Sequence, residues 1–546
     1  MEKRLLLAIV LSFLILVLWQ AVFVKKPSLP ESIPEAITET GEMHEQIPPQ
    51  EESPPPPPLE PAEEEFLPLY EELEKQITID TSLYRAVWSN RGGVLRSWKL
   101  KQHTDDNGEE LEIVSPISDE IKKYPFHLNT EDPEFDSLIN SALYTISGIS
   151  QELKEGQTGE IRFQYADEKG TRVEKVFSFA EGTYDFAVQI HVWKNGQEIE
   201  PRLLWGPGFS SVSPEAEKKR FGGATGIAVF SGDKVYRNEE RKYKPEKSFF
   251  NFVSWAAYEN NYFTALFLTS PQKTSAVFLK EEAEQIPIYF LSINHVQRAY
   301  IGPKDLESLS HFGYDAKKLI KFGFFGWIAE ILLKAIKAIH RIFPNWGFSI
   351  IILTFLIKVL FFPLTYSSTR SMAKMQELQP KMKAIRAKYK KAKQDIAQRR
   401  KMNEEIMKLY KEQGINPAGG CLPILIQLPI FWGFFRMLVV SIEFRHSPFI
   451  LWIRDLSLKD PFYVTPILMG ITQFISQKMT PTSADPTQQR MMLIMPVVMT
   501  IFFMNFQSGL VLYWLTNNVL QIGQQYIMNR LMHKKKRELH GKRRKK

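Results

Sequence analysis

One apolar run with a single charge inside it limits what this chain of 546 residues can fold into. Residues 345–365, NWGFSIIILTFLIKVLFFPLT, are long enough to cross a bilayer as a helix, with Trp346 and Tyr366 as interfacial aromatic residues at its ends. Lys358 lies inside this run, and a lysine at the bilayer centre costs about 2.5–3.5 kcal/mol. The run therefore predicts a polar groove inside a membrane protein. The alternative is that Lys358 lies near the cytoplasmic end and extends to the interface.

The N-terminus predicts another membrane segment. Lys3 and Arg4 precede an apolar run, residues 5–24, that is long enough to span and lacks the cleavage site of a signal peptide. Residues 1–26 are therefore expected to form an uncleaved signal anchor. Residues 27–69 are expected to form a disordered linker, because a segment rich in Pro and Glu buries too little apolar surface to fold.

Residues 70–312, called the β-domain below, show short alternating segments separated by turn residues. Strands are expected over 84–100 with a turn at 90–93, over 161–165 and 172–179 with a turn at 167–170, over 184–193, and over 288–294. The number and spacing of these segments predict one large β-sandwich. The β-domain contains no further membrane segment, so it should lie across the membrane from Lys3.

A bridging segment, residues 313–345, follows the β-domain. Within it, residues 326–343 are apolar except for a polar stripe that repeats every three or four residues. The stripe consists of Glu330, Lys334, Lys337 and Arg341. This pattern is typical of a helix that lies in the membrane interface. The alternative is a soluble amphipathic helix packed on the β-domain.

Two strongly basic segments follow. Residues 367–414 contain fourteen basic and five acidic side chains, and apolar residues recur at helical spacing on both sides of 391–394. We therefore expect two helices that fold into a hairpin. Residues 531–546 form a basic tail that includes Lys534, Lys535, Lys536, Arg537, Arg543 and Arg544. Such a tail suits phosphates, either of ribosomal RNA or of anionic lipid head groups.

Four more apolar segments complete a set of six expected spans. They cover residues 422–440, 463–476, 491–506 and 510–527. With a cytoplasmic N-terminus, six spans place both basic segments in the cytoplasm, as the positive-inside rule requires. Polar residues lie within the spans: Thr354, Gln427, Gln473, Asn517, Asn518 and Gln521. They can line a common cavity with Lys358, or serve only in hydrogen bonds between helices.

The chain lacks the motifs of nucleotide-driven, proteolytic and metal-dependent enzymes. It contains no P-loop, no Gly-x-Ser-x-Gly, no His-Glu-x-x-His and no clustered Cys and His ligands. Its one cysteine, Cys421, excludes an internal disulfide. We therefore expect no catalytic residues, no metal and no cofactor, and we do not expect an enzyme.

Several long motifs resemble the YidC family of membrane protein insertases, which includes mitochondrial Oxa-type and chloroplast Alb-type proteins. The motifs are NWGFSIIILTFLIKVLFFPLT followed by SMAKMQELQPKM, INPAGGCLPILIQLPIF, LWIRDLSLKDPFYVTPILMGITQFISQKM and SGLVLYW. The resemblance covers residues 302–530 closely. The signal anchor followed by a large exported β-domain resembles the Gram-negative type.

The resemblance implies a five-helix core, residues 346–530, that encloses a hydrophilic groove, and a periplasmic β-supersandwich before it. In the family, a positive residue in the groove attracts acidic residues of the client while the client's apolar helix moves into lipid. The matching positions are Lys358, Thr354, Gln427, Tyr513 and Trp514. Lys358 stands where arginine is common, and Trp514 where tyrosine is common.

The resemblance also implies partners and a location. Expected partners are nascent membrane proteins, the Sec translocon, membrane lipids, the ribosome and the signal-recognition-particle receptor, but not DNA. Recruitment would involve the hairpin residues Lys381, Lys383, Arg386, Arg399 and Arg400. The expected location is the bacterial inner membrane, with cytoplasmic termini and a periplasmic β-domain. Two alternatives are a solute transporter or channel with an intramembrane charge, and a membrane-anchored carbohydrate enzyme.

Overall fold

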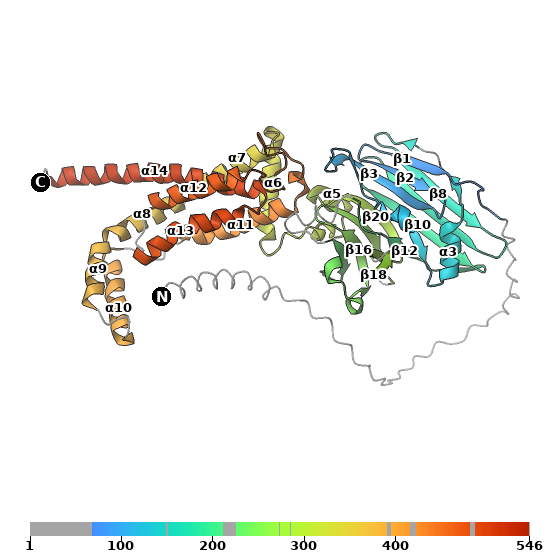
Figure 1. Ribbon diagram of the computed structural model, residues 1–546, viewed down its shortest axis with the longest axis horizontal. Helices are drawn as coiled ribbons and strands as arrows, with labels where there is room; N and C mark the ends of the chain where they lie inside the picture. Colours follow the sequence, from blue (N-terminus) through green and yellow to red (C-terminus); the bar gives the residue numbers. More distant parts are fainter. Residues whose placement is uncertain are drawn as a thin grey trace, which may run out of the picture. The chain divides into compact units, whose positions relative to one another are not determined.

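The structure is a computed structural model in which a β-rich part precedes a set of helices (Figure 1). It describes residues 68–148, 151–210, 225–271, 273–283, 286–389, 395–414, 422–480 and 486–544. The predicted signal anchor and nearly all of the linker lie outside these residues. Residues 65–546 belong to one compact unit.

The β-domain contains three sheets, in which the described strand pairs are antiparallel except for the parallel pair β1 and β7. The five-stranded first sheet has the order β4 (Glu110–Glu112), β3 (Val94–Thr104), β2 (Tyr84–Ser89), β1 (Gln76–Asp80) and β7 (Gln151–Glu152). The ten-stranded second sheet has the order β14 (Lys234–Glu239), β13 (Gly226–Ser231), β16 (Val253–Glu259), β17 (Phe263–Thr269), β20 (Val296–Pro303), β10 (Asp185–Lys194), β9 (Arg172–Ala180), β8 (Thr158–Ala166) and β6 (Thr145–Ser147), with β11 (Gln197–Ile199) on β10. The five-stranded third sheet has the order β15 (Phe249–Asn251), β18 (Ser275–Ala283), β19 (Ile286–Ile293), β12 (Arg202–Trp205) and β5 (His127–Asn129).

The hairpins predicted from turn residues are confirmed. β2 and β3 pair across residues 90–93, where Gly92 has a φ of 71°. A β-carbon at Gly92 would meet the carbonyl oxygen of Asn140 at 2.4 Å, so the turn requires glycine there. β8 and β9 pair across residues 167–170, as expected.

Aromatic side chains join the three sheets into one core. Trp88 on β2 lies with its ring centroid 4.2 Å from that of Phe177 on β9, which connects the first and second sheets. Trp205 on β12 lies 5.7 Å from Phe267 on β17, which connects the second and third. Both tryptophans are fully buried. Because large aromatic side chains contribute much of the buried apolar area of a core, these contacts hold the sheets together.

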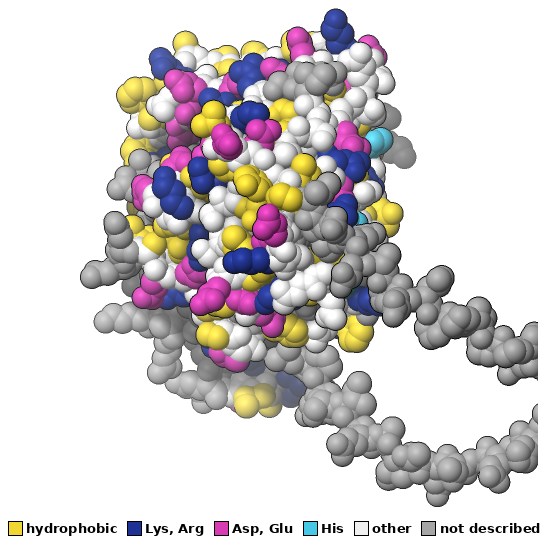
Figure 2. Space-filling model, turned by 90° about the vertical axis from the view of Figure 1, so that its right-hand side faces the viewer, with side chains coloured by type: hydrophobic (Ala, Val, Ile, Leu, Met, Phe, Trp, Pro, Cys, Tyr) yellow, Lys and Arg dark blue, Asp and Glu magenta, His cyan; other side chains and the backbone are white. Residues whose placement is uncertain are grey.

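The surface of the β-domain carries mixed charges. Figure 2 shows basic and acidic side chains interspersed over the face turned to the viewer, with hydrophobic side chains scattered between them. Ion pairs on the β-domain include Arg162 with Glu174 at 2.8 Å and Lys123 with Glu281 at 2.6 Å. Such mixed charge is typical of a solvated surface.

Helices make up the remainder of the described chain (Figure 1). The β-domain includes α2 (Ile117–Ile121), α3 (Pro133–Ser141) and α5 (Leu306–Phe312), with short turns η1 (Glu240–Lys242) and η2 (Pro245–Lys247), and the bridging segment contains the short turn η3 (Ala316–Leu319). The helical part contains α6 (Gly326–Ile342), α7 (Trp346–Leu360), α8 (Phe362–Glu377), α9 (Gln379–Lys388), α10 (Ile396–Glu412), α11 (Leu422–Val440), η5 (Ile442–Phe444), α12 (Val464–Met479), α13 (Pro486–Phe503) and α14 (Ser508–Arg544). α14 packs against α7, α11 and α12, and α6 packs against α7 and α11.

The expectation of one continuous helix over residues 345–365 is wrong at its C-terminal end. α7 ends at Leu360, and α8 begins at Phe362 with Pro363 in its first turn. Proline has no N–H to continue the helical hydrogen bonds, and it fits the first turn of a new helix. No described helix is by itself long and apolar enough to span a membrane; α6 and α7 reach that length and composition only as a pair, with a bend of 120° between them. Six spans remain a prediction.

The hairpin expected within residues 367–414 is built from α9 and α10. Pro380 lies in the first turn of α9, and the Asp395 carboxylate accepts hydrogen bonds from the first N–H groups of α10. Met382 on α9 and Tyr410 on α10 are buried, and the Tyr410 hydroxyl lies 3.1 Å from the Met382 sulfur. A small apolar core therefore holds the two helices together.

A buried ion cluster joins the β-domain to the bridging segment. The Glu259 carboxylate pairs with Arg237 at 2.8 Å and with Lys304 at 2.6 Å. Arg237 also donates to the carbonyls of Lys318 and Leu319, at 3.1 and 2.8 Å. Burial raises the pKa of Glu259, but Lys304 and Arg237 lower it further, so the pKa lies below its ordinary value.

Glu259→Gln should lower the free energy of unfolding by about 3–5 kcal/mol, because the buried Lys304 and the half-buried Arg237 lose their counter-ion. The exposed Glu246→Gln is the control and should change this free energy by less than about 0.5 kcal/mol. Since the folded-state pKa of Glu259 is lowered, its stabilisation is present above about pH 4.5 and is lost as the pH falls. Thermal unfolding of the full-length protein at neutral and acidic pH should therefore show a weaker pH dependence for Glu259→Gln. An unchanged pH dependence would contradict this role.

Candidate functional site

α7 places the Lys358 side chain against α14. The Nζ of Lys358 donates a hydrogen bond to Oε1 of Gln521 over 2.8 Å, and the lysine side chain is half-buried. On the same helix, Phe355, Leu356 and Val359 are about half exposed. The charged group therefore points toward another helix, while apolar side chains of α7 point outward.

Thr354 lies one turn before Lys358 but is satisfied within its own helix. Its hydroxyl donates to the carbonyl of Ile350 over 2.6 Å, and its side chain is 1% exposed. A threonine that bonds back to its helix offers little to a second group. Thr354 therefore lies beside the lysine as a small buried residue, rather than as its hydrogen-bond partner.

α14 carries a row of polar side chains on one face, which we call the polar row. It consists of Trp514, Asn518, Gln521 and Gln525, which recur every three or four residues. Trp514 Nε1 donates to Gln473 Oε1 over 3.2 Å, and Asn518 Nδ2 donates to the carbonyl of Met469 over 3.2 Å. Both acceptors belong to α12, whereas Lys358 belongs to α7. The polar row therefore contacts both α7 and α12.

Tyr513 lies next to the polar row in sequence but faces a different helix. Its hydroxyl accepts a hydrogen bond from Gln427 Nε2 on α11 over 2.6 Å. Its ring stacks on Phe434 with the centroids 4.2 Å apart, and the side chain is 2% exposed. Four of the five predicted groove residues therefore form two groups against α14: Lys358 contacts the polar row, which includes Trp514, and Gln427 contacts Tyr513.

The structure adds partners that the sequence did not assign. Gln521 and Gln473 are recognisable in the sequence as polar residues within apolar segments, but their pairing with Lys358 and Trp514 is not. The spacing of the polar row was the available signal, since it places Trp514 and Gln521 on one helical face. Which helix that face meets depends on the tertiary packing.

Comparison with known proteins decides the family. Residues 338–536 match the family profile described as "60Kd inner membrane protein", and residues 76–335 match "YidC periplasmic domain". A protein of Syntrophus aciditrophicus named "Membrane protein insertase YidC" is 36% identical over 97% of this chain and 100% of its own length. The chain belongs to the YidC family of membrane protein insertases.

Other similar proteins carry the same name. A Geotalea daltonii protein, also named "Membrane protein insertase YidC", is 38% identical over 84% of this chain and 87% of its own length. Among solved structures, "Active YidC insertase crystal structure with the first transmembrane domain resolved" is 20% identical, covers 84% of this chain and 95% of its own, and has a TM-score of 0.35.

The loop between α11 and α12 is held by a buried carboxylate. Asp460 is 2% exposed and accepts hydrogen bonds from Trp452 Nε1 and Phe462 N at 3.0 Å each, and from Thr465 N and Oγ1 at 2.7 and 2.8 Å. The Ser508 N–H, at the start of α14, donates to a carbonyl of the same loop over 2.7 Å. Asp460 therefore fixes the loop to the start of α12, and the bond from Ser508 joins the same loop to the start of α14.

The basic hairpin residues lie on the surface. Lys381, Lys383, Arg386, Arg399 and Arg400 are all exposed, and Arg400 forms an ion pair with Glu404 at 3.2 Å. The side chains of the predicted tail residues lie outside the described residues, although the backbone of α14 continues to Arg544. The hairpin therefore carries exposed positive charge on its outer surface.

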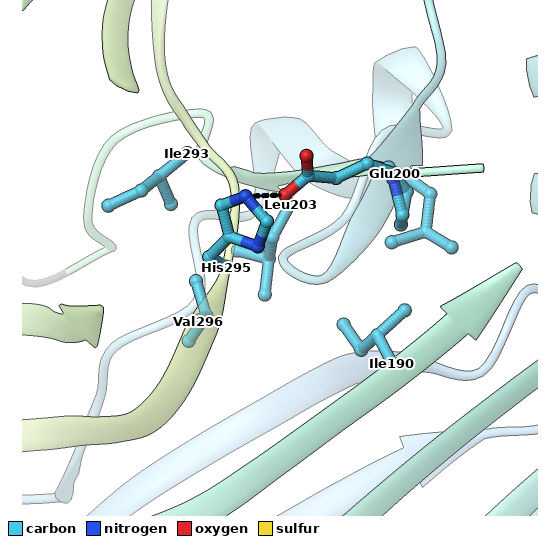
Figure 3. A pocket seen from close by; sticks show the side chains of 8 residues that line it. Ile190, Glu200, Leu203, Ile293, His295 and Val296 are labelled. Carbon is cyan, nitrogen blue, oxygen red and sulfur yellow. Dashed lines mark ion pairs between the residues drawn. The ribbon is translucent and has the colours of Figure 1, made fainter. Parts of the chain in front are cut away.

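Two hollows in the β-domain bear on the alternative of a carbohydrate enzyme. A cavity of about 340 Å³ is lined by Glu240, which accepts a hydrogen bond from the Tyr258 hydroxyl and is the one carboxylate among the described lining residues. A smaller cavity of about 80 Å³ contains the ion pair of His295 and Glu200 beside aliphatic side chains (Figure 3). Neither lining, as far as it is described, offers the two carboxylates typical of glycoside hydrolysis. The described residues also contain no group of three or more His, Cys, Asp or Glu placed to hold a metal ion.

Asp460→Asn should lower the free energy of unfolding by about 1–3 kcal/mol, because an amide nitrogen would replace an oxygen that accepts hydrogen bonds. Asp455→Asn is a matched control, since the Asp455 carboxylate accepts one described hydrogen bond, from Ser457 N at 2.7 Å. Thermal unfolding and protease cleavage of the α11–α12 loop are the measurements. Equal effects of the two variants would show that Asp460 does not hold the loop.

Proposed function

We propose that this chain inserts the membrane-spanning segments of client proteins into the bacterial inner membrane through the polar space between α7, α12 and α14. One observation carries the proposal: Lys358 is bound to Gln521 inside the bundle, while the neighbouring helices expose apolar side chains outward. Examples are Ile471 on α12, Val497 and Ile501 on α13, and Val519 on α14, each at least half exposed. A bundle that exposes apolar side chains outward and holds a lysine and several amides between its helices suits a lipid environment.

The mechanism follows from the placement of the charge. The ammonium of Lys358 attracts acidic side chains in the extramembrane part of a client, which brings that segment into the polar space. The amides of Gln473, Asn518 and Gln521 provide hydrogen bonds that reduce the cost of moving polar groups through the bundle. The apolar segment of the client meanwhile moves sideways out of the bundle into lipid, where its apolar side chains are removed from water. These steps require no covalent intermediate and no nucleotide.

The family supports a finer architecture, which we include in the proposal. The termini are cytoplasmic, six spans include the N-terminal anchor, residues 346–530 form a five-helix core, and the β-domain is a periplasmic β-supersandwich. The match of residues 76–335 to the YidC periplasmic domain and the basic character of the hairpin and tail support this orientation.

The central prediction concerns the charge of Lys358. In proteoliposomes, Lys358→Ala should lower insertion of a single-span client with an acidic exported tail by about tenfold, which corresponds to about 1.4 kcal/mol. Lys358→Arg should retain most of the activity because it keeps the charge. Lys334→Ala, which removes an exposed charge on α6, is the control. If Lys358→Ala inserts the client as well as the wild type does, insertion depends on the shape and hydration of the bundle instead of on the charge at position 358.

The partners are part of the proposal as well. We propose that the basic hairpin recruits clients together with the signal-recognition-particle receptor. We also propose that the Sec translocon lies beside the core when a client needs the translocon as well as this protein. The basic tail contacts ribosomal RNA, because clustered Lys and Arg neutralise phosphates. Anionic lipid is the competing ligand of the tail.

Removal of residues 534–546 should abolish co-sedimentation with ribosomes in detergent that contains no anionic lipid. Raising the salt concentration should weaken the wild-type interaction steeply, since each phosphate contact releases counterions. A tail of equal length with Gln in place of Lys and Arg is the matched control for chain length. Unchanged co-sedimentation of the truncated protein would leave lipid as the ligand.

A further inference from the structure

The partner of Lys358 is a neutral amide. Gln521 Oε1 accepts from the Lys358 Nζ over 2.8 Å, and the two residues come from α7 and α14. Within the described residues, Lys358 forms no ion pair with a carboxylate. An amide oxygen stabilises an ammonium through a hydrogen bond but leaves its positive charge in place. The pair therefore positions a charge without neutralising it.

The neighbours of Gln521 fix where this amide lies. Trp514 and Asn518, on the same face of α14, are hydrogen-bonded to α12 through Gln473 and the Met469 carbonyl. Asn518 is 3% exposed, so its contact with α12 is made in the interior of the bundle. These contacts restrict rotation of α14. The Gln521 amide is consequently held at one position along α7, opposite Lys358. The Lys358 side chain is thereby directed into the polar space rather than toward the outside of the bundle.

Charge decides how an incoming client group competes with Gln521. The bond from the Lys358 ammonium to the Gln521 amide has one charged partner, whereas a client carboxylate adds attraction between opposite charges, so the carboxylate is the better acceptor. It can replace Gln521 without separating an existing ion pair. A carboxylate fixed at position 521 would instead compensate the lysine permanently, because attraction between charges is strong in a partly buried site.

We propose that Gln521 is a positioning and specificity-determining residue: it holds Lys358 in the polar space, and its neutrality keeps the groove selective for acidic client segments. This inference rests on the proposed insertion function. The residue concerned, Gln521 on α14, carries no charge itself. The selectivity for acidic client segments thus depends on Lys358 and its amide partner together.

The test uses the full-length protein in proteoliposomes and three clients that differ only in an acidic, neutral or basic extramembrane segment. The measured quantity is the ratio of acidic to basic client inserted. Gln521→Glu should lower this ratio on the order of tenfold. Gln197→Glu, the same change at an exposed position on β11, should leave it unchanged. Combining Gln521→Glu with Lys358→Ala should invert the ratio, because the groove then carries an uncompensated negative charge.

Gln521→Met tests the positioning role independently and introduces no charge. It should lower insertion of the acidic client by roughly threefold, as expected for loss of one hydrogen bond, and leave the neutral client unaffected. A purely structural defect would lower all three clients equally, and that result would overturn the positioning role. A wild-type ratio in folded Gln521→Glu would overturn the selectivity role.

The outcomes also separate this inference from the function on which it rests. If Lys358→Ala keeps the wild-type preference for the acidic client, the proposed role of the groove charge is wrong. If Lys358→Ala abolishes the preference while Gln521→Glu and Gln521→Met both behave as wild type, the groove charge stands and only the role of Gln521 is wrong.

Discussion

Burying the ammonium of Lys358 requires an acceptor from another helix, because a charge in an apolar environment is costly unless polar groups surround it. α14 supplies that acceptor, and the same helix packs against α7, α11 and α12. Its polar contacts reach three different helices through Gln521, Trp514 and Tyr513. The arrangement of the core therefore depends on how α14 is rotated, since rotation decides which polar group meets which helix.

The β-domain is held together in a different way. Its three sheets share an aromatic core, and the second sheet contacts both of the others through Trp88 and Trp205. The contact with the bridging segment adds a polar link: Arg237, paired with Glu259 and through it with Lys304, donates to the carbonyls of η3. A non-directional apolar core gives the β-domain its stability, while directional ion pairs fix how its last strands lead into the bridging segment.

Local signals in the sequence predicted the elements better than their contacts. Turn glycines such as Gly92 identified the hairpins, and Pro363 carried the information that α7 must end before it, although the apolar run around it suggested a longer helix. Of the five groove residues matched to the family, Tyr513 and Trp514 face different helices. Adjacent residues on a helix point about 100° apart, and only the packing of whole helices shows that Tyr513 meets α11 and Trp514 meets α12.

The continuity of α14 has a mechanical consequence. Its 37 residues form one helix from Ser508 to Arg544, with a length of about 55 Å at 1.5 Å per residue. Gln521 and the basic tail are thus parts of one continuous helix, and a rotation of either part is transmitted to the other through the helical hydrogen bonds. A change in the orientation of the tail therefore also changes the orientation of the Gln521 amide that holds Lys358.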